Sequence, residues 1–197
     1  VYETVQIGNQ LWMKENLKVT HYNDGTEIPT GYSNEEWTDL STGAYAVYND
    51  DPSKADIYCN LFNWLAVIDD RVICLEDFHV LHVDEIMELV MLLVISESDP
   101  NLHNGFRGTN EGSKLAGNTD LWYSGSLENN SEFGTSGFSA FPAGYRSIAN
   151  GTYDSMGSYG YFWSSSENSS NDAWYRLLNY GYSDVYRSNF YKLSGFS

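Results

Sequence analysis

The first residues of the chain alternate between hydrophobic and polar side chains, which predicts a β-hairpin. Val5 and Ile7 are separated by polar neighbours, and Leu11 and Met13 continue the alternation after Gly8-Asn9. A period of two places hydrophobic residues on one face of a strand, and a Gly-Asn pair favours a short turn. We therefore expect two antiparallel strands at the start of the chain.

A polar and turn-rich stretch, residues 18–56, follows the hairpin and contains NDGTEIP, STGAY and YNDDPSK. Clusters of Asn, Asp, Gly, Ser and Pro are typical of loops rather than of helices or strands. Large aromatic residues interrupt the stretch at Trp37, Tyr45 and Tyr48. We expect a long ordered loop region that these three side chains anchor to the core.

Two segments with helical spacing come next. Residues 60–69 place four hydrophobic side chains on one face, namely Leu61, Trp64, Leu65 and Ile68. Residues 83–95 predict a second helix with five such side chains, namely Ile86, Leu89, Val90, Leu93 and Val94. The second helix has acidic residues in its first turns, where the helix dipole favours negative charge. It must end before Asp99-Pro100, because a residue that precedes Pro resists helical geometry.

After Pro100 the pattern changes to short strands and Gly-rich turns. The candidate strands are Gly137–Ala143, Tyr161–Ser165, Ala173–Leu178, Val185–Asn189 and Lys192–Ser197. The chain has no internal repeat and no linker that would separate two domains. Residues 1–197 therefore form one α+β domain.

Composition and charge exclude some classes of partner. The chain is 42% hydrophobic and 16% aromatic, which is typical of a globular protein. Its net charge of −17 argues against nucleic acid or an anionic membrane as partner, because both require clustered Lys and Arg. No stretch approaches the roughly 20 apolar residues of a membrane span. No signal peptide is visible, and a chain that begins with Val1 is compatible with removal of a leader.

The last third of the chain has the composition of a recognition surface. It holds nine of the 16 tyrosines, namely Tyr145, Tyr153, Tyr159, Tyr161, Tyr175, Tyr180, Tyr182, Tyr186 and Tyr191. Rigid aromatic rings mixed with Ser, Asn and Gly give contact area at a low cost in conformational entropy. The same composition is also found in solvent-facing strands, so it does not establish binding by itself.

Several motifs together resemble a known family. They are TVQIGNQLWMKENL, HYNDGTEIP, NLFNWLAV, GFSAFPAGYR, YGYFWSSSE and VYRSNFYKLSGFS. The chain resembles the Fibrobacter succinogenes major paralogous domain, a module of bacterial surface proteins related to the C-type lectin fold. The resemblance implies two helices packed on small antiparallel sheets with long ordered loops. It also implies that the N- and C-terminal strands are adjacent, and that the protein is located extracellularly or on the cell surface.

One segment departs from the family pattern. Where members carry Cys-Pro-x-Gly-Trp-His-x-Pro, this chain has CLEDFHVLH, which keeps Cys74 and His79 but places Phe78 and Leu81 at the Trp and final Pro positions. The resemblance implies that the usual partner of Cys74 is a terminal Cys, which this chain lacks. Cys59, at a position where members have Gly, leaves two alternatives open: a Cys59–Cys74 disulfide or two buried thiols.

The sequence offers no catalytic residues. Formylglycine-generating enzymes share the wider fold and use cysteines late in the chain, but no Cys follows Cys74. Phosphate-binding loops, nucleophile elbows and zincin helices are also absent from the sequence. We therefore expect a protein that is not an enzyme.

Metal sites are also weakly indicated. His79 and His82 have ligand-like spacing, but two His at the start of a helix favour packing or capping, so we assign no metal ligands. No cofactor is expected except for structural calcium, with candidate carboxylates at residues 49–51 and at Asp69-Asp70.

The best candidate site is the polar and aromatic face of the C-terminal strands. Six positions that match the family motifs are expected to hold the fold, namely Tyr175, Arg176, Val185, Arg187, Gly195 and Phe196. Of these, Phe196 is expected in the core, and the Arg side chains are expected to pair with carboxylates. The residues between them are expected to face outward and bind the ligand, namely Trp174, Asn179, Tyr180, Tyr182, Ser183, Asp184, Ser188, Asn189 and Tyr191.

The expected function is a non-catalytic, secreted or surface-displayed recognition module whose ligand is a glycan or a surface protein. An Asn-, Tyr- and Ser-rich tail also resembles variable regions that retroelements diversify. The alternative is a structural subunit or decorating domain of a surface appendage or phage particle, which would self-assemble or belong to a larger parent protein.

Overall fold

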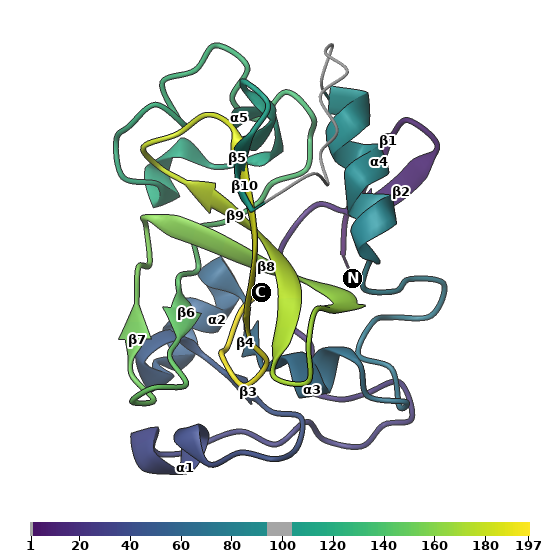
Figure 1. Cartoon of the computed structure of the whole chain (residues 1–197), viewed down its shortest axis with the longest axis vertical. Coiled ribbons are helices and arrows are strands. Elements are labelled where there is room, and N and C mark those ends of the chain that lie inside the picture. Colours follow the sequence, from purple (N-terminus) through teal and green to yellow (C-terminus); the bar gives the residue numbers. More distant parts are fainter. Residues whose placement is uncertain (1, 94–103) are drawn as a thin grey trace.

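The computed structural model describes residues 2–93 and 104–197 as a mixed α/β fold with few helices and small antiparallel sheets (Figure 1). The helical elements are α1 (Asn34–Thr38), η1 (Tyr48–Asp50), α2 (Pro52–Tyr58), α3 (Trp64–Val67), α4 (Val83–Leu93), α5 (Glu111–Leu115) and η2 (Thr119–Leu121). The strands are β1 (Thr4–Ile7), β2 (Gln10–Met13), β3 (Tyr45–Ala46), β4 (Leu61–Phe62), β5 (Gly105–Arg107), β6 (Tyr145–Arg146), β7 (Tyr153–Asp154), β8 (Tyr159–Glu167), β9 (Asp172–Asn179) and β10 (Val185–Tyr191). No helix in the described ranges is long and apolar enough to cross a membrane.

A four-stranded antiparallel sheet occupies the centre, in the order β5-β10-β9-β8. In Figure 1, α4 and the β1–β2 hairpin lie to one side of this sheet and the β6–β7 pair lies to the other. The predicted strands Tyr161–Ser165, Ala173–Leu178 and Val185–Asn189 are confirmed as parts of β8, β9 and β10. Each observed strand is longer than the predicted one by one or two residues at one end or at both ends.

The predicted N-terminal hairpin is confirmed. Val5 pairs with Trp12, and Ile7 pairs with Gln10, so only Gly8-Asn9 forms the loop. Gly8 has a φ of +59°, which is the conformation that the first position of such a turn requires and that Gly adopts without steric cost.

The helix predicted over residues 60–69 is wrong in its first part. Leu61 and Phe62 form β4, which pairs with β3, and the helix α3 covers only Trp64–Val67. Asn63 separates the two elements, because its side-chain Oδ1 accepts hydrogen bonds from the backbone N–H of Ala44 and of Ala66. The helical spacing of Leu61 therefore reflects burial in a strand, which the pattern alone does not distinguish from burial on a helix.

The second predicted helix is confirmed as α4, Val83–Leu93, and its residues Ile86, Leu89 and Val90 are buried. Val94 and Ile95, which the prediction also included, lie outside the described residues. The loop region 18–56 contains the short elements α1, β3 and η1 and the start of α2, and Trp37 anchors it as expected because its side chain is fully buried.

Two predicted strands do not form as such. Residues 137–143 do not form a strand, because their backbone groups bond to scattered segments: Ala140 N–H donates to Leu115 O, and Phe141 N–H donates to Asn16 Oδ1. Residues 192–197 likewise make only isolated bridges, from Gly195 to Arg146 and from Phe196 to Phe62. The first and last strands are not paired with each other, because β1 pairs with β2 whereas β10 pairs with β5 and β9.

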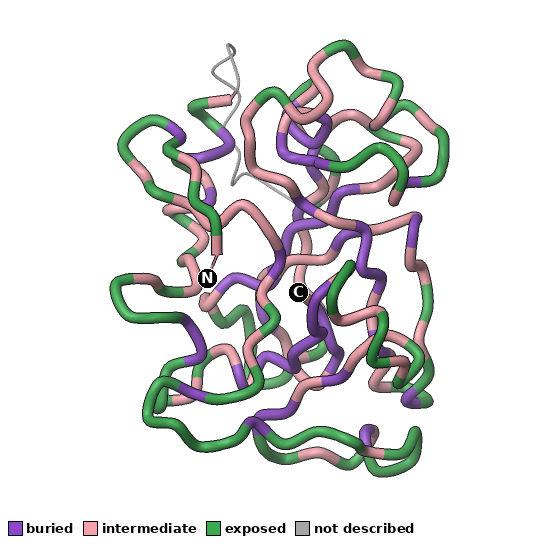
Figure 2. Tube along the Cα trace, turned by 180° about the vertical axis from the view of Figure 1, so that it is seen from behind, coloured by how far each residue is buried: buried purple, intermediate pink, exposed green. Residues whose placement is uncertain are grey.

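Figure 2 shows the buried segments gathered along the middle of the molecule, with exposed loops around them. Cys59 and Cys74 are both buried free thiols, so the disulfide alternative is not realised. Burial raises the pKa of the Cys59 thiol to about 12 and that of Cys74 to about 11. Both thiols are therefore protonated and unreactive at neutral pH.

Replacement of Phe196 by Ala should strongly destabilise the fold. The ring is fully buried and stacks on Trp163 and Tyr161, at centroid distances of 4.3 and 4.6 Å. We expect Phe196→Ala to lower the free energy of unfolding by about 3–5 kcal/mol, measured by urea denaturation. Tyr191→Ala, at a side chain that is 58% exposed, should cost less than about 1 kcal/mol. Equal losses in the two variants would contradict the central position of Phe196.

Candidate ligand-binding site

An exposed group of three aromatic rings lies where β5 meets β10. The ring of Tyr182 stacks on Phe106, with centroids 4.1 Å apart and planes inclined by 22°. Tyr186 packs edge-on against Phe106 at 4.9 Å. Tyr182 is 50% exposed and Phe106 is 38% exposed. We refer to Phe106, Tyr182 and Tyr186 as the aromatic platform.

Stacking leaves the Tyr182 side chain accessible. Phe106 covers one face of the Tyr182 ring, yet the residue as a whole is 50% exposed. An exposed aromatic ring on a fixed side chain is a surface on which a ligand can stack.

The turn between β9 and β10 fixes the position of Tyr182. Asn179 Oδ1 accepts a hydrogen bond from Gly181 N–H at 2.9 Å, and Asn179 O accepts from Tyr182 N–H at 2.9 Å. Ser183 Oγ donates to Thr109 O at 2.8 Å. Two residues predicted to bind ligand, Asn179 and Ser183, thus use side-chain atoms to hold the turn.

Tyr180 and Asp184 are both partly buried. Tyr180 packs against a hydrophobic cluster that includes Leu127, and its carbonyl oxygen accepts from Leu127 N–H at 3.0 Å. Burial raises the pKa of the Asp184 carboxyl, and the nearby Glu111 carboxylate adds to the rise. The Tyr180 ring is therefore not fully free to face outward, and a ligand-binding role for Asp184 stays a prediction.

The other predicted residues are not part of the aromatic platform. Asn189 pairs with Trp174 across β10 and β9, and Ser188 pairs with Tyr175. Because side chains alternate along a strand, Asn189 lies on the opposite face of the sheet from Tyr186. Tyr191 is exposed at the end of β10. The nine predicted residues do not share one surface, and of these nine only Tyr182 belongs to the aromatic platform.

The six residues expected to hold the fold are all buried. Arg176 does not form the expected ion pair with a described carboxylate, and Arg187 contacts an aromatic ring. Arg176 donates to Tyr175 O at 3.4 Å. The Arg187 guanidinium lies 3.6 Å from the centroid of the Trp174 ring. Burial, together with the smaller effects of the neighbouring Arg187 and Arg107, lowers the pKa of Arg176 to about 9.

Both candidate calcium clusters bond to their own chain. Asp50 Oδ1 accepts from Tyr153 Oη at 2.6 Å, Asp51 caps α2, and Asp69 forms an ion pair with Arg71 at 2.7 Å. Among residues 2–93 and 104–197, no three His, Cys, Asp or Glu side chains are grouped so that they could hold a metal. Structural calcium stays a prediction.

His79 and His82 contact the start of α4, as the capping interpretation expects. Glu85 accepts from His82 backbone N–H and contacts His79 Nε2, both at 2.8 Å. His82 Nδ1 lies 3.0 Å from Ser166 Oγ, which connects the start of α4 to β8.

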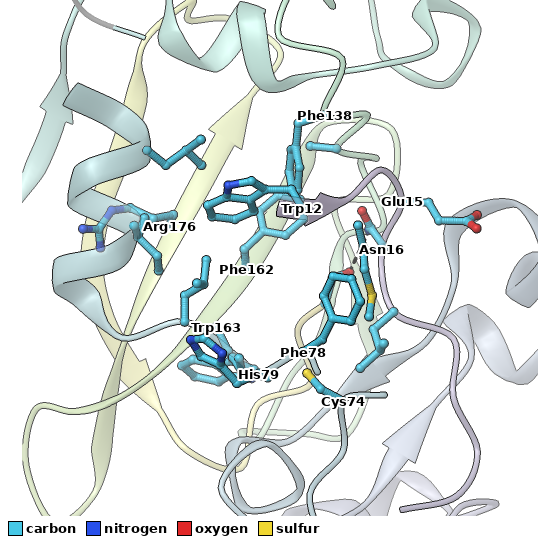
Figure 3. Close-up of a pocket in the computed structure, with 18 of the residues that line it drawn as sticks. Trp12, Glu15, Asn16, Cys74, Phe78, His79, Phe138, Phe162, Trp163 and Arg176 are labelled. Carbon is cyan, nitrogen blue, oxygen red and sulfur yellow. Dashed lines mark hydrogen bonds between the residues drawn. The ribbon is translucent and has the colours of Figure 1, made fainter. Parts of the chain in front are cut away.

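A second feature is an apolar pocket of about 270 Å³ (Figure 3). Its walls come from β2, residues 73–81, α4, residues 138–140 and the strands β8–β10. Sequence analysis missed this pocket, although CLEDFHVLH, the segment that departs from the family pattern, supplies one wall. It also missed Phe106, whose partner Tyr182 is distant in the sequence.

Comparison with known proteins gives one match. The model of the Fibrobacter succinogenes major domain family matches residues 5–197. No curated protein and no solved structure matches the chain significantly.

The two neighbouring tyrosines of the β9–β10 turn should respond differently to truncation. Tyr180→Ala removes a ring that packs against the core, so we expect it to lower the free energy of unfolding by about 2 kcal/mol. Tyr182→Ala removes a ring that is 50% exposed and should cost about 1 kcal/mol or less. Thermal or urea denaturation measures both, and a larger loss for Tyr182→Ala would contradict the assignment.

Glu85→Gln should destabilise the protein at neutral pH but not in acid. His82 N–H and His79 hold the pKa of Glu85 below its usual value, against the effect of burial, so the carboxylate stabilises the fold above the unfolded pKa. This contribution is lost as pH falls through the lowered pKa. We expect a difference of about 0.5–1 kcal/mol at pH 7 that vanishes below about pH 4, measured by urea denaturation. Glu76→Gln, at an exposed position, is the control, and a difference independent of pH would refute the prediction.

Proposed function

The chain belongs to the Fibrobacter succinogenes major domain family, and we propose that it is a non-catalytic recognition module that binds carbohydrate through the aromatic platform. One observation carries the proposal: the Tyr182 ring is stacked on Phe106 at 4.1 Å and is nevertheless 50% exposed. A pyranose presents a face of C–H groups, and such a face packs well on an open aromatic ring.

The platform is also pre-organised. The hydrogen bonds of Asn179 and Ser183 fix the turn that carries Tyr182, and stacking on Phe106 restricts the Tyr182 ring. Side chains that are already ordered lose little entropy when a ligand binds. The net charge of −17 disfavours anionic ligands, so the expected ligand is a neutral glycan.

The fold that we propose for this module is C-type lectin-like. Few helices, small antiparallel sheets and long connections support the assignment. A location outside the cell, secreted or on the surface, is part of the same proposal. If retroelements diversify the tail, Tyr182 and Tyr191 are the positions that can be exchanged with the least effect on the fold, because both side chains are exposed.

A glycan array probed with the purified chain, with and without chelator, tests the proposal. We expect binding to neutral glycans that Tyr182→Ala and Phe106→Ala each weaken by at least about tenfold, because each removes one ring of the stack. Tyr191→Ala is the matched control, since Tyr191 is exposed but lies outside the platform. Loss of binding with chelator would additionally reveal calcium.

Three outcomes would contradict the proposal. The first is equal glycan binding by Tyr182→Ala and Tyr191→Ala. The second is binding to surface proteins only, which would favour a protein ligand. The third is the formation of ordered polymers without ligand, seen by electron microscopy, together with no glycan binding, which would favour the structural-subunit alternative.

A further inference from the structure

We propose that the apolar pocket is a second binding site, which takes one small, uncharged hydrophobic molecule. The pocket has a volume of about 270 Å³, and most of its lining residues are aliphatic or aromatic. Concave apolar pockets of this kind are where proteins bind small molecules. Such a ligand differs in chemistry from a glycan, so the proposal goes beyond the function assigned to the aromatic platform.

Aromatic rings in the walls of the pocket are fixed by contacts with neighbouring residues. Trp12 packs edge-on against Phe138, with centroids 5.4 Å apart. Trp163 donates from Nε1 to Phe62 O at 3.0 Å and stacks on Phe196 at 4.3 Å. Because these rings are fixed by neighbours, the pocket cannot close by a simple change of side-chain rotamer.

Several polar groups around the pocket are hydrogen-bonded or directed elsewhere. The Asn16 side chain bonds to Phe141 N–H at 3.2 Å and to Ser197 Oγ at 3.0 Å. His79 contacts Glu85 at 2.8 Å. In Figure 3 the guanidinium of Arg176 and the carboxylate of Glu15 both point away from the middle of the pocket. The lining is mainly apolar, and burial of a ligand charge in such surroundings is costly.

The size of the pocket limits the occupant to a small molecule. An apolar cavity of about 150 Å³ in another protein stays dry and binds benzene. A volume of about 270 Å³ therefore suits a molecule with about ten carbon atoms, such as a bicyclic aromatic or a medium-length alkyl group. A helix of a partner protein, with a diameter of about 10 Å, is too wide.

The sheet separates this pocket from the aromatic platform. Val185 lines the pocket, whereas its neighbour Tyr186 belongs to the platform, and successive side chains on a strand point to opposite faces. The two sites can therefore be tested independently, and failure of one proposal leaves the other unaffected.

Fluorescence titration of the full chain with N-phenyl-1-naphthylamine, an uncharged probe, tests the proposal. We expect saturable binding with one site per chain, displacement of the probe by naphthalene, and a rise in melting temperature with naphthalene. The charged analogue 2-naphthoate should compete at least about tenfold less well, because a carboxylate is costly to bury in a mainly apolar pocket. Absence of saturable binding, or tighter binding of 2-naphthoate, would overturn the proposal.

Two adjacent residues of α4 provide matched variants. Val90 is buried and lines the pocket, whereas Met91 does not line it and is 54% exposed. Val90→Phe should fill the pocket and weaken probe binding at least about tenfold, while Met91→Phe should change it less than about twofold. Equal binding by the two variants would refute the site. If Val90→Phe does not fold, Val90→Ala provides the test, because it enlarges the pocket. A shift of binding in favour of ligands larger than naphthalene would then support the proposal. An unchanged ligand preference would overturn it.

Discussion

The anchoring of the last three residues, of which Gly195 and Phe196 are buried, is the constraint on which the other elements depend. Phe196 exchanges two backbone hydrogen bonds with Phe62, at 2.7 and 2.9 Å, and Gly195 exchanges two with Arg146, at 3.0 and 2.9 Å. Ser197 bonds to the backbone of β8 through Tyr161 and Trp163. One short segment thus joins β4, β6 and β8, which belong to three different sheets. Its backbone is satisfied by these partners, so the Phe196 ring can be fully buried.

Arg146 extends this centre into the loop region. Its guanidinium is fully buried, lies over the rings of Trp37 and Tyr153 at 4.4 and 4.8 Å, and donates to Tyr32 O and Gly151 O. Burial lowers the pKa of Arg146 from its ordinary value. Carbonyl oxygens and aromatic faces therefore compensate for the desolvated charge, and in doing so they order a region that has little regular secondary structure.

The sequence predicted elements whose partners are close along the chain and failed where the partners are distant. The β1–β2 hairpin, α4 and the strands β8–β10 each show a local periodicity that their burial explains. Residues 137–143 and 192–197 bond to several remote segments, and no local pattern encodes such contacts. The site shows the same limit: exposure of Tyr182 was predicted, but its partner Phe106 is on β5, and the burial of Tyr180 depends on a loop near Leu127. Nothing in the residues around Tyr180 distinguishes it from Tyr182.

The two proposed sites depend on this centre in different ways. The aromatic platform is formed by β5, β10 and a turn that its own hydrogen bonds fix, so its shape follows from the sheet. The apolar pocket has one wall from the sheet and another from residues 73–81, where this chain has Phe78 and Leu81 at the Trp and Pro positions of the family pattern. That wall contributes no strand to the central sheet. Substitutions in residues 73–81 can therefore alter the pocket while the sheet, the C-terminal segment and the platform keep their geometry. The ligand of the pocket can then vary independently of the ligand of the platform.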